Sequence, residues 1–317
     1  MEFELFHSAA FLDTLKAVYD VEEVPALSRR IDSDTPFLRS RKPFKRGSIF
    51  SLPLGFYQTA DYFKARWHGD EWERIKAFAA GHRANVAITT VGALDVAPGM
   101  LRANNPVLRL GGSDDPSQGY TRNLKANLKT EWNKAARHGV TIAASHERAD
   151  LQAFYRVLAT QYVREHRMVF QPYGLYDRFL SPQGPGLLIV ARHEARVVGG
   201  LFLLADAGVL HYNWGAREQL GNLSIGTLLI DHAIQHAKAS GFAAFDFGST
   251  PLSDAALFDF KMRWGCENLP VYRYYTTTAP MQLDLNASFS GARRLYAHLP
   301  VSFAMRLMPV VVPWLVS

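Results

Sequence analysis

The chain has 317 residues, of which 48% are hydrophobic and 20% charged, with a formal net charge of +6 and a single cysteine. This composition excludes a disordered or fibrous protein, and one cysteine excludes an internal disulfide and indicates a reducing compartment. The length suits two domains of ordinary size. Because Glu2 and Glu4 stand where a secretory signal would carry lysines, we expect a cytoplasmic protein. The positive charge indicates either an anionic partner or simply a basic surface.

The first half of the sequence predicts mixed α/β structure. Residues 48–58 and 84–92 have the composition of strands, and residues 70–82 have the periodicity of an amphipathic helix between them. A second helix is predicted over 122–138, where Gly139 stops it before a strand at 140–145.

Two stretches concentrate positive charge. Residues 39–46 hold five basic side chains in eight positions. On the helix at 122–138, Arg122, Lys125 and Lys129 fall at i, i+3 and i+7, so they share a face. Such a face is either a solvated helix surface or a docking site for phosphate groups.

The second half predicts a longer series of elements. In chain order these are a helix, three antiparallel strands joined by tight turns, a helix, a strand, a helix and a final strand; the first seven are placed at 150–166, 187–193, 196–205, 209–215, 222–241, 242–248 and from about Ser253. This order of elements is that of the GNAT acyltransferase fold.

Three motifs make the resemblance more specific. The segments DFGSTPLSDAALFDFKMRWGCENLPVYRYY (246–275), TRNLKANLKTEWNKAARHGVTI (121–142) and SLPLGFY (51–57) resemble the closing motif, the basic helix and an early strand of the FemAB-like branch of the GNAT superfamily. That branch includes peptidoglycan-bridge aminoacyltransferases and CelD/BcsL-type proteins. The resemblance implies an α/β (α+β) fold of tandem GNAT-like domains, each a mixed, mostly antiparallel sheet flanked by helices. We therefore expect a degenerate GNAT-like domain over 1–145, and over 146–317 a GNAT domain with the closing motif and an apolar tail.

One lysine stands among aromatic residues in the closing motif. On the helix from about Ser253, Leu257, Phe260 and Trp264 form an apolar stripe, and Lys261 borders it. Lys261 either extends past the rings to water or lends its charge to an anionic group in a cleft. The FemAB resemblance favours the second interpretation, in which Lys261 stabilises the anionic intermediate of acyl transfer or holds a substrate phosphate.

Asp246 ends a predicted buried strand, where a carboxylate needs a partner. It either caps the turn at 248–253 or acts in catalysis, by positioning the nucleophile or by accepting its proton. Gly248 gives the backbone freedom to turn sharply after it. An Asp-Phe-Gly motif also occurs in protein kinases, but this chain lacks the His-Arg-Asp loop and the glycine-rich phosphate loop that accompany it there.

The loop before the helix at 222–241 is the predicted donor site. In GNAT enzymes that use coenzyme A, a Gln/Arg-x-x-Gly-x-Gly/Ala loop binds the pyrophosphate, whereas QLGNLSIG at 219–226 has glycines only at 221 and 226. A helix N-terminus still offers free N–H groups to an anion, so we expect Ser224, Ile225, Gly226 and Thr227 to bind acyl-CoA. Because FemAB relatives include enzymes that take aminoacyl groups from tRNA, aminoacyl-tRNA is the alternative donor.

Aromatic and basic residues complete the predicted substrate site. On the strand at 209–215, Tyr212 and Trp214 alternate to one face and His211 and Asn213 to the other. The two rings either belong to the core or stack on a sugar or acyl group. The full set of predicted substrate contacts is Tyr212, Trp214, Phe260, Trp264, Arg122, Lys125 and Lys129, of which the basic three suit tRNA or a nucleotide-linked or lipid-pyrophosphate glycan.

We expect no metal and no covalent intermediate. His232 and His236 fall at i and i+4 of a helix, but they lack the intervening acid of a zincin and an evident third ligand, so they fit a polar helix face. Cys266 has no histidine placed by the sequence to activate it, and we expect a small buried residue.

The C-terminal segment at 301–317 is apolar, but Arg306, Pro309 and Pro313 interrupt it and it is too short to span a bilayer comfortably. We expect it to pack against the body of the protein, and contact with the inner face of a membrane is the alternative.

The sequence thus predicts a transferase that moves an acyl group from acyl-CoA to an amino or hydroxyl group of a cell-envelope or exopolysaccharide precursor, a small-molecule or lipid-linked glycan. Two alternatives stand beside it. One is an aminoacyltransferase that uses aminoacyl-tRNA and forms a peptide bond. The other is a non-catalytic GNAT scaffold that binds a glycan precursor or a biosynthetic complex, which the irregular donor loop favours and the intact Lys261 and Asp246 oppose.

Overall fold

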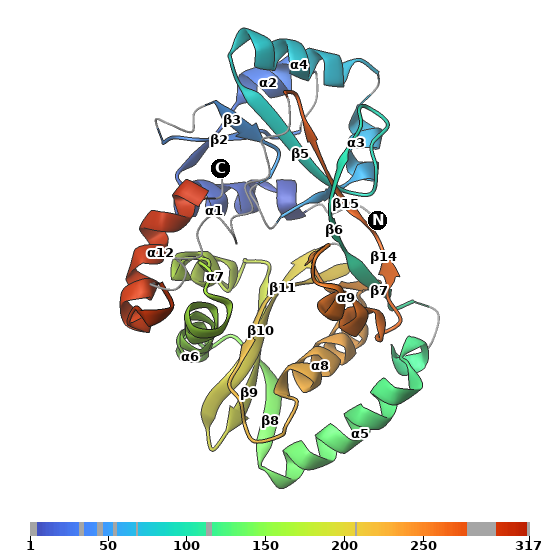
Figure 1. Cartoon of the computed structure of the whole chain (residues 1–317), viewed down its shortest axis with the longest axis vertical. Helices are drawn as coiled ribbons and strands as arrows, with labels where there is room; N and C mark the ends of the chain where they lie inside the picture. The colour runs from blue at the N-terminus through green and yellow to red at the C-terminus, as the bar shows by residue number, and fades with distance from the viewer. Residues whose placement is uncertain are drawn as a thin grey trace. The chain divides into compact units, whose positions relative to one another are not determined.

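The structure is a computed structural model that describes residues 5–31, 35–42, 47–52, 56–67, 69–111, 116–206, 208–277 and 296–315 (Figure 1). The chain divides into two compact units. Unit 1 comprises Met1–Asn105, Leu269–Ser290 and Met308–Ser317, and unit 2 comprises Pro106–Asn268 and Gly291–Leu307.

Unit 1 is built on a mixed sheet whose strands run in the order β1-β2-β3-β5-β15-β6, with β4 pairing to β5. The strands are β1 (Val21–Glu23), β2 (Leu38–Ser40), β3 (Ser48–Phe50), β4 (Gln58–Thr59), β5 (Asn85–Val91), β6 (Met100–Asn104) and β15 (Val271–Tyr275). The α-helices are α1 (Ala9–Tyr19), α2 (Pro25–Arg30), α3 (Ala60–Arg66) and α4 (Glu71–Gly81). The helix predicted at 70–82 and the strand predicted at 84–92 are confirmed as α4 and β5.

Unit 2 is built on a second mixed sheet, of order β14-β7-β12-β11-β10-β9-β8. Its strands are β7 (Pro106–Arg109), β8 (Val140–Ser145), β9 (Gly186–His193), β10 (Arg196–Asp206), β11 (Val209–Arg217), β12 (Ala244–Asp246) and β14 (Glu267–Asn268). Its α-helices are α5 (Arg122–Arg137), α6 (Arg148–Gln161), α7 (Tyr173–Phe179), α8 (Ile225–Ala239) and α9 (Ala255–Met262). A π-helical turn over Tyr162–His166 extends α6.

The sheet of unit 2 lies between two helical layers, because side chains alternate along β10. Leu201 and Leu203 belong to a core cluster with residues of α8 and α5. Phe202 points the other way and packs edge-to-face against Tyr176 of α7, with 5.1 Å between ring centroids. The predicted α/β class, with two mixed and mostly antiparallel sheets flanked by helices, is confirmed.

The boundary between the units differs from the expected division at residue 145. The strand β7 pairs with β12, so unit 2 begins at Pro106, and α5 and β8 belong to it. In return β15, expected as the closing strand of the C-terminal domain, pairs with β5 and β6 of unit 1. A boundary read along the chain misses this exchange, because strand partners far apart in sequence leave no local signal.

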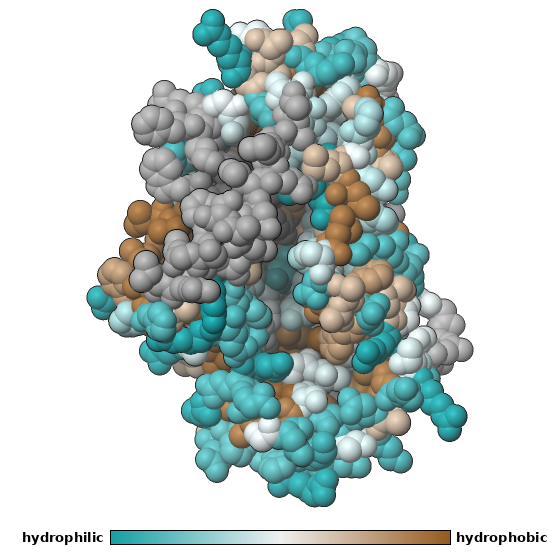
Figure 2. All heavy atoms as spheres, in the orientation of Figure 1, coloured by the Kyte–Doolittle hydropathy of each residue, from teal (hydrophilic) through white to brown (hydrophobic). Residues whose placement is uncertain are grey.

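The C-terminal segment forms α12 (Val301–Leu315), which continues through Pro309 and Pro313 instead of being broken by them. Ala304, Met308 and Val312 form a buried stripe on it, whereas Phe303 and Val310 are 49% and 62% exposed. Figure 2 shows hydrophobic side chains on the outward side of this helix. Among the described residues, no helix combines the length and the hydrophobicity that crossing a bilayer requires.

Candidate active site

Two neighbouring strands of unit 2 separate at one point. The strands β11 and β12 pair in parallel at Val209↔Ala244, Leu210↔Phe245 and His211↔Asp246, and the pairing ends there. β11 runs on to Arg217 against β10, while β12 leaves the sheet after Asp246. The edge of β11 beyond His211 that would face β12 therefore has no strand partner among the described residues.

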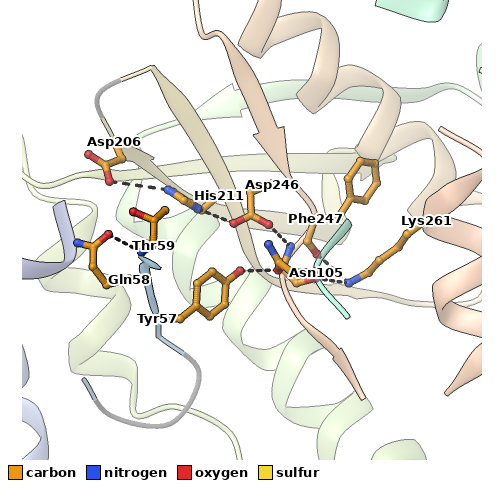
Figure 3. A network of polar contacts seen from close by, with 10 residues as sticks. Tyr57, Gln58, Thr59, Asn105, Asp206, His211, Asp246, Phe247 and Lys261 are labelled. Carbon is orange, nitrogen blue, oxygen red and sulfur yellow. Dashed lines mark hydrogen bonds and ion pairs between the residues drawn. The ribbon is translucent and has the colours of Figure 1, made fainter. Parts of the chain in front are cut away.

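His211 and Asp246, at the last paired position of β11 and β12, contact each other. Nδ1 of His211 lies 2.9 Å from Oδ2 of Asp246, and Nε2 lies 3.8 Å from Oδ2 of Asp206, so the imidazole stands between two carboxylates (Figure 3). His211 and Asp246 are 2% and 0% exposed. Burial, the largest influence, lowers the pKa of His211, but the hydrogen bonds and charges of Asp206 and Asp246 outweigh it and raise the pKa above its ordinary value. The arrangement favours an imidazolium.

Asp246 also fixes the turn that follows. Its Oδ1 accepts a hydrogen bond of 2.8 Å from the N–H of Gly248. Gly248 has φ of 72°, and a Cβ there would come within 2.8 Å of the carbonyl oxygen of Tyr212, so only glycine fits. Both carboxylate oxygens of Asp246 thus have a partner, and Oδ1 stabilises the turn at Gly248.

Lys261 lies on α9 and reaches the same turn. Its Nζ donates to the carbonyl oxygens of Phe247 at 2.8 Å and Gly248 at 2.9 Å, and the residue is only 6% exposed (Figure 3). Burial lowers the pKa of Lys261 to about 8, although the charge of Asp246 acts in the opposite direction. An ammonium has three donors, and among the described residues the third N–H has no acceptor. Lys261 and Asp246 thus both contact the turn at Phe247 and Gly248.

The predicted donor site lies at the start of α8, in an open pocket lined by Arg217, Glu218, Gln219, Asn222, Leu223, Ser224, Gly226 and Thr227. Two of the four predicted N–H groups are already used, because Ser224 donates to Oε2 of Glu131 at 2.7 Å and Ile225 to the carbonyl of Leu223. The N–H groups of Gly226 and Thr227 point out of the first helical turn, where an α-helix provides no internal acceptor.

Arg217 is a site residue that the sequence analysis missed. It is exposed at the end of β11, and its Nε would lie 3.2 Å from a Cβ at Gly226, so its side chain covers the first turn of α8. Within the described part of the chain no carboxylate pairs with it, whereas Glu218 is held by Arg196 and Glu131 by Lys134. The only sequence signal for Arg217 is its position seven residues before Ser224 of the predicted donor site.

Comparisons with known proteins agree with this geometry. Residues 122–262 match the model of the acetyltransferase (GNAT) domain family. L-PGS from Bacillus licheniformis has a similar structure, with a TM-score of 0.59 and 14% identity over 91% of this chain and 93% of that one. The C-terminal domain of a putative lysylphosphatidylglycerol synthetase from Agrobacterium fabrum gives 0.57 and 13% over 91% of both chains. FemX gives 0.57 and 12% over 86% of this chain and 92% of its own.

The segment of unit 2 over residues 122–262 is thus similar to the GNAT domain family. At these identities the solved structures establish the fold alone. No curated protein matches the sequence.

The predicted aromatic contacts Tyr212 and Trp214 lie on opposite faces of the sheet of unit 2. The sequence expectation that Tyr212 and Trp214 share a face is wrong, because β11 has a bulge: Leu203 pairs with Tyr212 and Phe202 with Trp214, which leaves Asn213 as the extra residue. Tyr212 therefore packs on the α8 side. Trp214 packs edge-to-face against Tyr176 of α7 on the other side, with 5.0 Å between ring centroids.

The aromatic residues of α9 and its end belong largely to the core. Trp264 is 0% exposed and packs edge-on against Tyr120, with centroids 5.0 Å apart, so it cannot contact a substrate directly. Phe260 is partly buried against the same core cluster. Cys266 is buried as expected, and burial raises the pKa of its thiol.

The two basic stretches differ in how much of their charge is paired with carboxylates. On α5, Leu124, Leu128 and Ala135 are buried as predicted, and Arg122, Lys125 and Lys129 are exposed without a carboxylate partner in the described residues. In the first stretch, Arg39 and Arg41 contact Glu22, and Lys42 contacts Asp20 at 2.8 Å. Residues 43–46 lie outside the described residues. Among the described residues of these two stretches, the α5 stripe, Arg122, Lys125 and Lys129, keeps its charge available to a partner.

Proposed function

We propose that the protein is a GNAT-type acyltransferase that moves an acyl group from acyl-CoA to an amino or hydroxyl group of a cell-envelope or exopolysaccharide precursor. The observation that carries the proposal is the separation of β11 from β12 at His211 and Asp246. β11 leads from this point to Arg217 and the first turn of α8, so one strand connects the turn held by Lys261 to an anion-binding helix terminus.

The donor would bind along that strand. The residues present suit a pyrophosphate: Arg217 contributes a guanidinium, and Gly226 and Thr227 contribute free N–H groups. Acyl-CoA bound here would supply the acyl group, which is activated as a thioester. The protein holds the phosphates at α8 and leaves the free edge of β11 to the acyl part.

Lys261 would act on the charge that develops during acyl transfer. Attack by an amine or hydroxyl on the acyl carbonyl places negative charge on its oxygen, and a fixed cation nearby lowers the barrier. Collapse of this intermediate would break the C–S bond and release the coenzyme A thiolate, which takes up a proton to replace the one that the nucleophile loses to solvent. Its Nζ is already oriented by the carbonyls of Phe247 and Gly248, which leaves one N–H for a reacting group or a substrate phosphate. Asp246 is fully buried, so in this proposal it is a positioning residue that holds the turn.

The aminoacyl-tRNA alternative is favoured by one observation, the exposed α5 stripe. The names of the similar lysylphosphatidylglycerol synthetases indicate a phospholipid acceptor in those proteins, so a lipid-linked acceptor also fits this chain.

We further propose that unit 1 is the degenerate GNAT-like domain and contributes to acceptor binding, and that the protein works in the cytoplasm at or near the inner face of the membrane.

The test is native mass spectrometry of the protein purified from cells, which identifies a co-purifying coenzyme A ester, nucleotide sugar or tRNA, followed by calorimetric titration with acetyl-CoA. Arg217→Ala should weaken acetyl-CoA binding by about tenfold or more, the effect of losing one charge-assisted contact. Arg156→Ala removes an equally exposed arginine on α6 and serves as the control.

Ribonuclease treatment that abolishes turnover, with no response to acyl-CoA, identifies aminoacyl-tRNA as the donor. A folded wild type that binds neither donor supports the scaffold alternative.

A further inference from the structure

The sheet of unit 1 carries an arginine on the face opposite its helical core. On β15, Tyr272 and Tyr274 pack with the core cluster around Val86 and Ile88. Because side chains alternate along a strand, Arg273 between them points to the other face. Its partner across the antiparallel pair with β5 is Thr89, whose side chain lies on the same face.

A second arginine stands beside the first because the register between β15 and β6 is irregular. Val271 pairs with Ala103 but Tyr272 pairs with Leu101, so Arg102 is the extra residue of a bulge. Burial lowers the pKa of Arg273, and the nearby charge of Arg102 lowers it further, while Tyr275 acts in the opposite direction. The fold thus places two cations next to each other.

The contacts of this pair leave its charge uncompensated. Nε of Arg273 is buried and forms no hydrogen bond among the described residues. The guanidinium Cζ lies 5.3 Å from the ring centroid of Tyr275, and Nη1 of Arg102 lies 3.5 Å from Sδ of Met100. Three other arginines of unit 1 are ion-paired: Arg39 and Arg41 contact Glu22, and Arg74 contacts Asp70 at 2.9 Å. Arg102 and Arg273 have no such carboxylate within the described residues.

An arginine side chain stays charged at neutral pH, and a guanidinium held out of water without a counter-ion is costly. Both arginines remain partly exposed, so a dissolved anion can reach them. Two planar guanidinium groups present parallel N–H donors in the geometry that phosphate oxygens accept. We propose that Arg102 and Arg273, with the hydroxyl of Thr89, form a phosphate-binding site in unit 1. This site rests on unit 1 alone and stands whether or not unit 2 transfers an acyl group.

The experiment is calorimetric titration and thermal unfolding at constant ionic strength with three probes. Inorganic phosphate and pyrophosphate represent free phosphates, and glycerophosphoglycerol represents the headgroup of a phospholipid. The variants are Arg102→Met, Arg273→Met, Arg273→Lys and Thr89→Ala. Arg29→Met is the control, because it removes an equal charge from an exposed position on α2 of the same unit.

The wild type should bind at least one probe, and the probe it prefers identifies the source of the phosphate. Arg102→Met and Arg273→Met should each weaken binding by about tenfold or more, Arg273→Lys should weaken it less, and Arg29→Met should leave it unchanged. Without ligand, Arg273→Met should unfold about 2–4 °C higher than the wild type, since it removes a partly buried charge that has no counter-ion among the described residues. A purely structural arginine would give the opposite shift.

Three results overturn the proposal: no binding of any probe by the wild type at about 10 mM, equal binding by the wild type and both Met variants, or an equal loss in Arg29→Met. Should Arg273→Met fail to fold, Arg102→Met and Thr89→Ala replace it as the test. Binding that is unchanged in both of these variants then overturns the proposal.

Discussion

Nδ1 of His211 lies 2.9 Å from Oδ2 of Asp246 at the last position where β11 and β12 pair. The same imidazole faces Asp206 on β10, so a buried histidine stands between two buried carboxyl groups. Their position matters because Asp246 also accepts from Gly248 and thereby sets the turn that Lys261 contacts. The charge arrangement inside the sheet is thus connected to the turn that carries the proposed catalytic lysine.

His211→Asn should lower the free energy of unfolding by about 3–5 kcal/mol, because it leaves two buried carboxylates without their cation. The pKa of His211 is raised in the folded state, so this stabilisation is complete below the unfolded-state value of 6.5 and is lost as the pH rises through the folded-state value. Urea unfolding from pH 5 to 9 measures both effects. The variant should lose the pH dependence, and His146→Asn, at an exposed position of unit 2, should keep it. An unchanged dependence in His211→Asn contradicts the assignment.

Lys261 should separate activity from stability as the pH rises. Its pKa is lowered to about 8, so a reaction that needs the ammonium should slow above that pH. Between the folded value of about 8 and the ordinary 10.5, the unfolded chain binds more protons, so folding stability should increase over the same interval. Acyl-transfer rates and urea unfolding from pH 7 to 10 measure the two trends.

Lys261→Met should abolish turnover while the chain remains folded, and Lys261→Arg should retain a small fraction of it, since it keeps the charge but does not fit two carbonyl acceptors in the same way. Lys64→Met, exposed on α3, is the control for a lost lysine charge. Full activity in Lys261→Met would show that the lysine only ties α9 to the turn.

Local patterns were enough to predict most elements of unit 2. The stripe Leu124, Leu128 and Ala135 gave α5 within one residue at its end, and the tight turns between β9, β10 and β11 gave their antiparallel order. These features depend on neighbours in sequence. The transfer of β7 to unit 2 and of β15 to unit 1 depends on pairing between strands more than a hundred residues apart, which periodicity does not report.

The site was predictable only where a motif marked it. Lys261 and Asp246 were chosen from the closing motif, and the structure brings them to one turn. The role of His211 was missed because it depends on the parallel register that sets it opposite Asp246. The error at Tyr212 and Trp214 has the same origin, since simple alternation cannot reveal a bulge at Asn213.

The α5 stripe should distinguish the two donors. Changing Arg122, Lys125 and Lys129 together to Gln removes three exposed charges without altering the buried stripe, so the free energy of unfolding should change by less than about 1 kcal/mol. Acetyl-CoA binding, which we place at Arg217 and α8, should be unchanged. If the wild type binds tRNA in a filter assay, the variant should bind it more weakly and with a smaller salt dependence. Loss of acetyl-CoA binding in this variant contradicts the placement of the donor. Changing Arg29, Arg30 and Lys64 to Gln controls for net charge.

The exposed side of α12 should bind anionic membranes. Phe303 and Val310 face outward, Arg306 lies between them, and no acidic residue follows Asp284 in the sequence, a combination typical of helices that lie in a bilayer surface. The protein should therefore sediment with vesicles that contain phosphatidylglycerol and less with neutral phosphatidylcholine vesicles. Phe303→Glu together with Val310→Glu should remove the binding, because two carboxylates would enter the apolar boundary. Ser302→Glu and Arg306→Gln change charge on the same helix without removing an apolar contact, and they should reduce sedimentation only modestly. If all these variants sediment alike, the vesicles are held by another basic surface and not by α12.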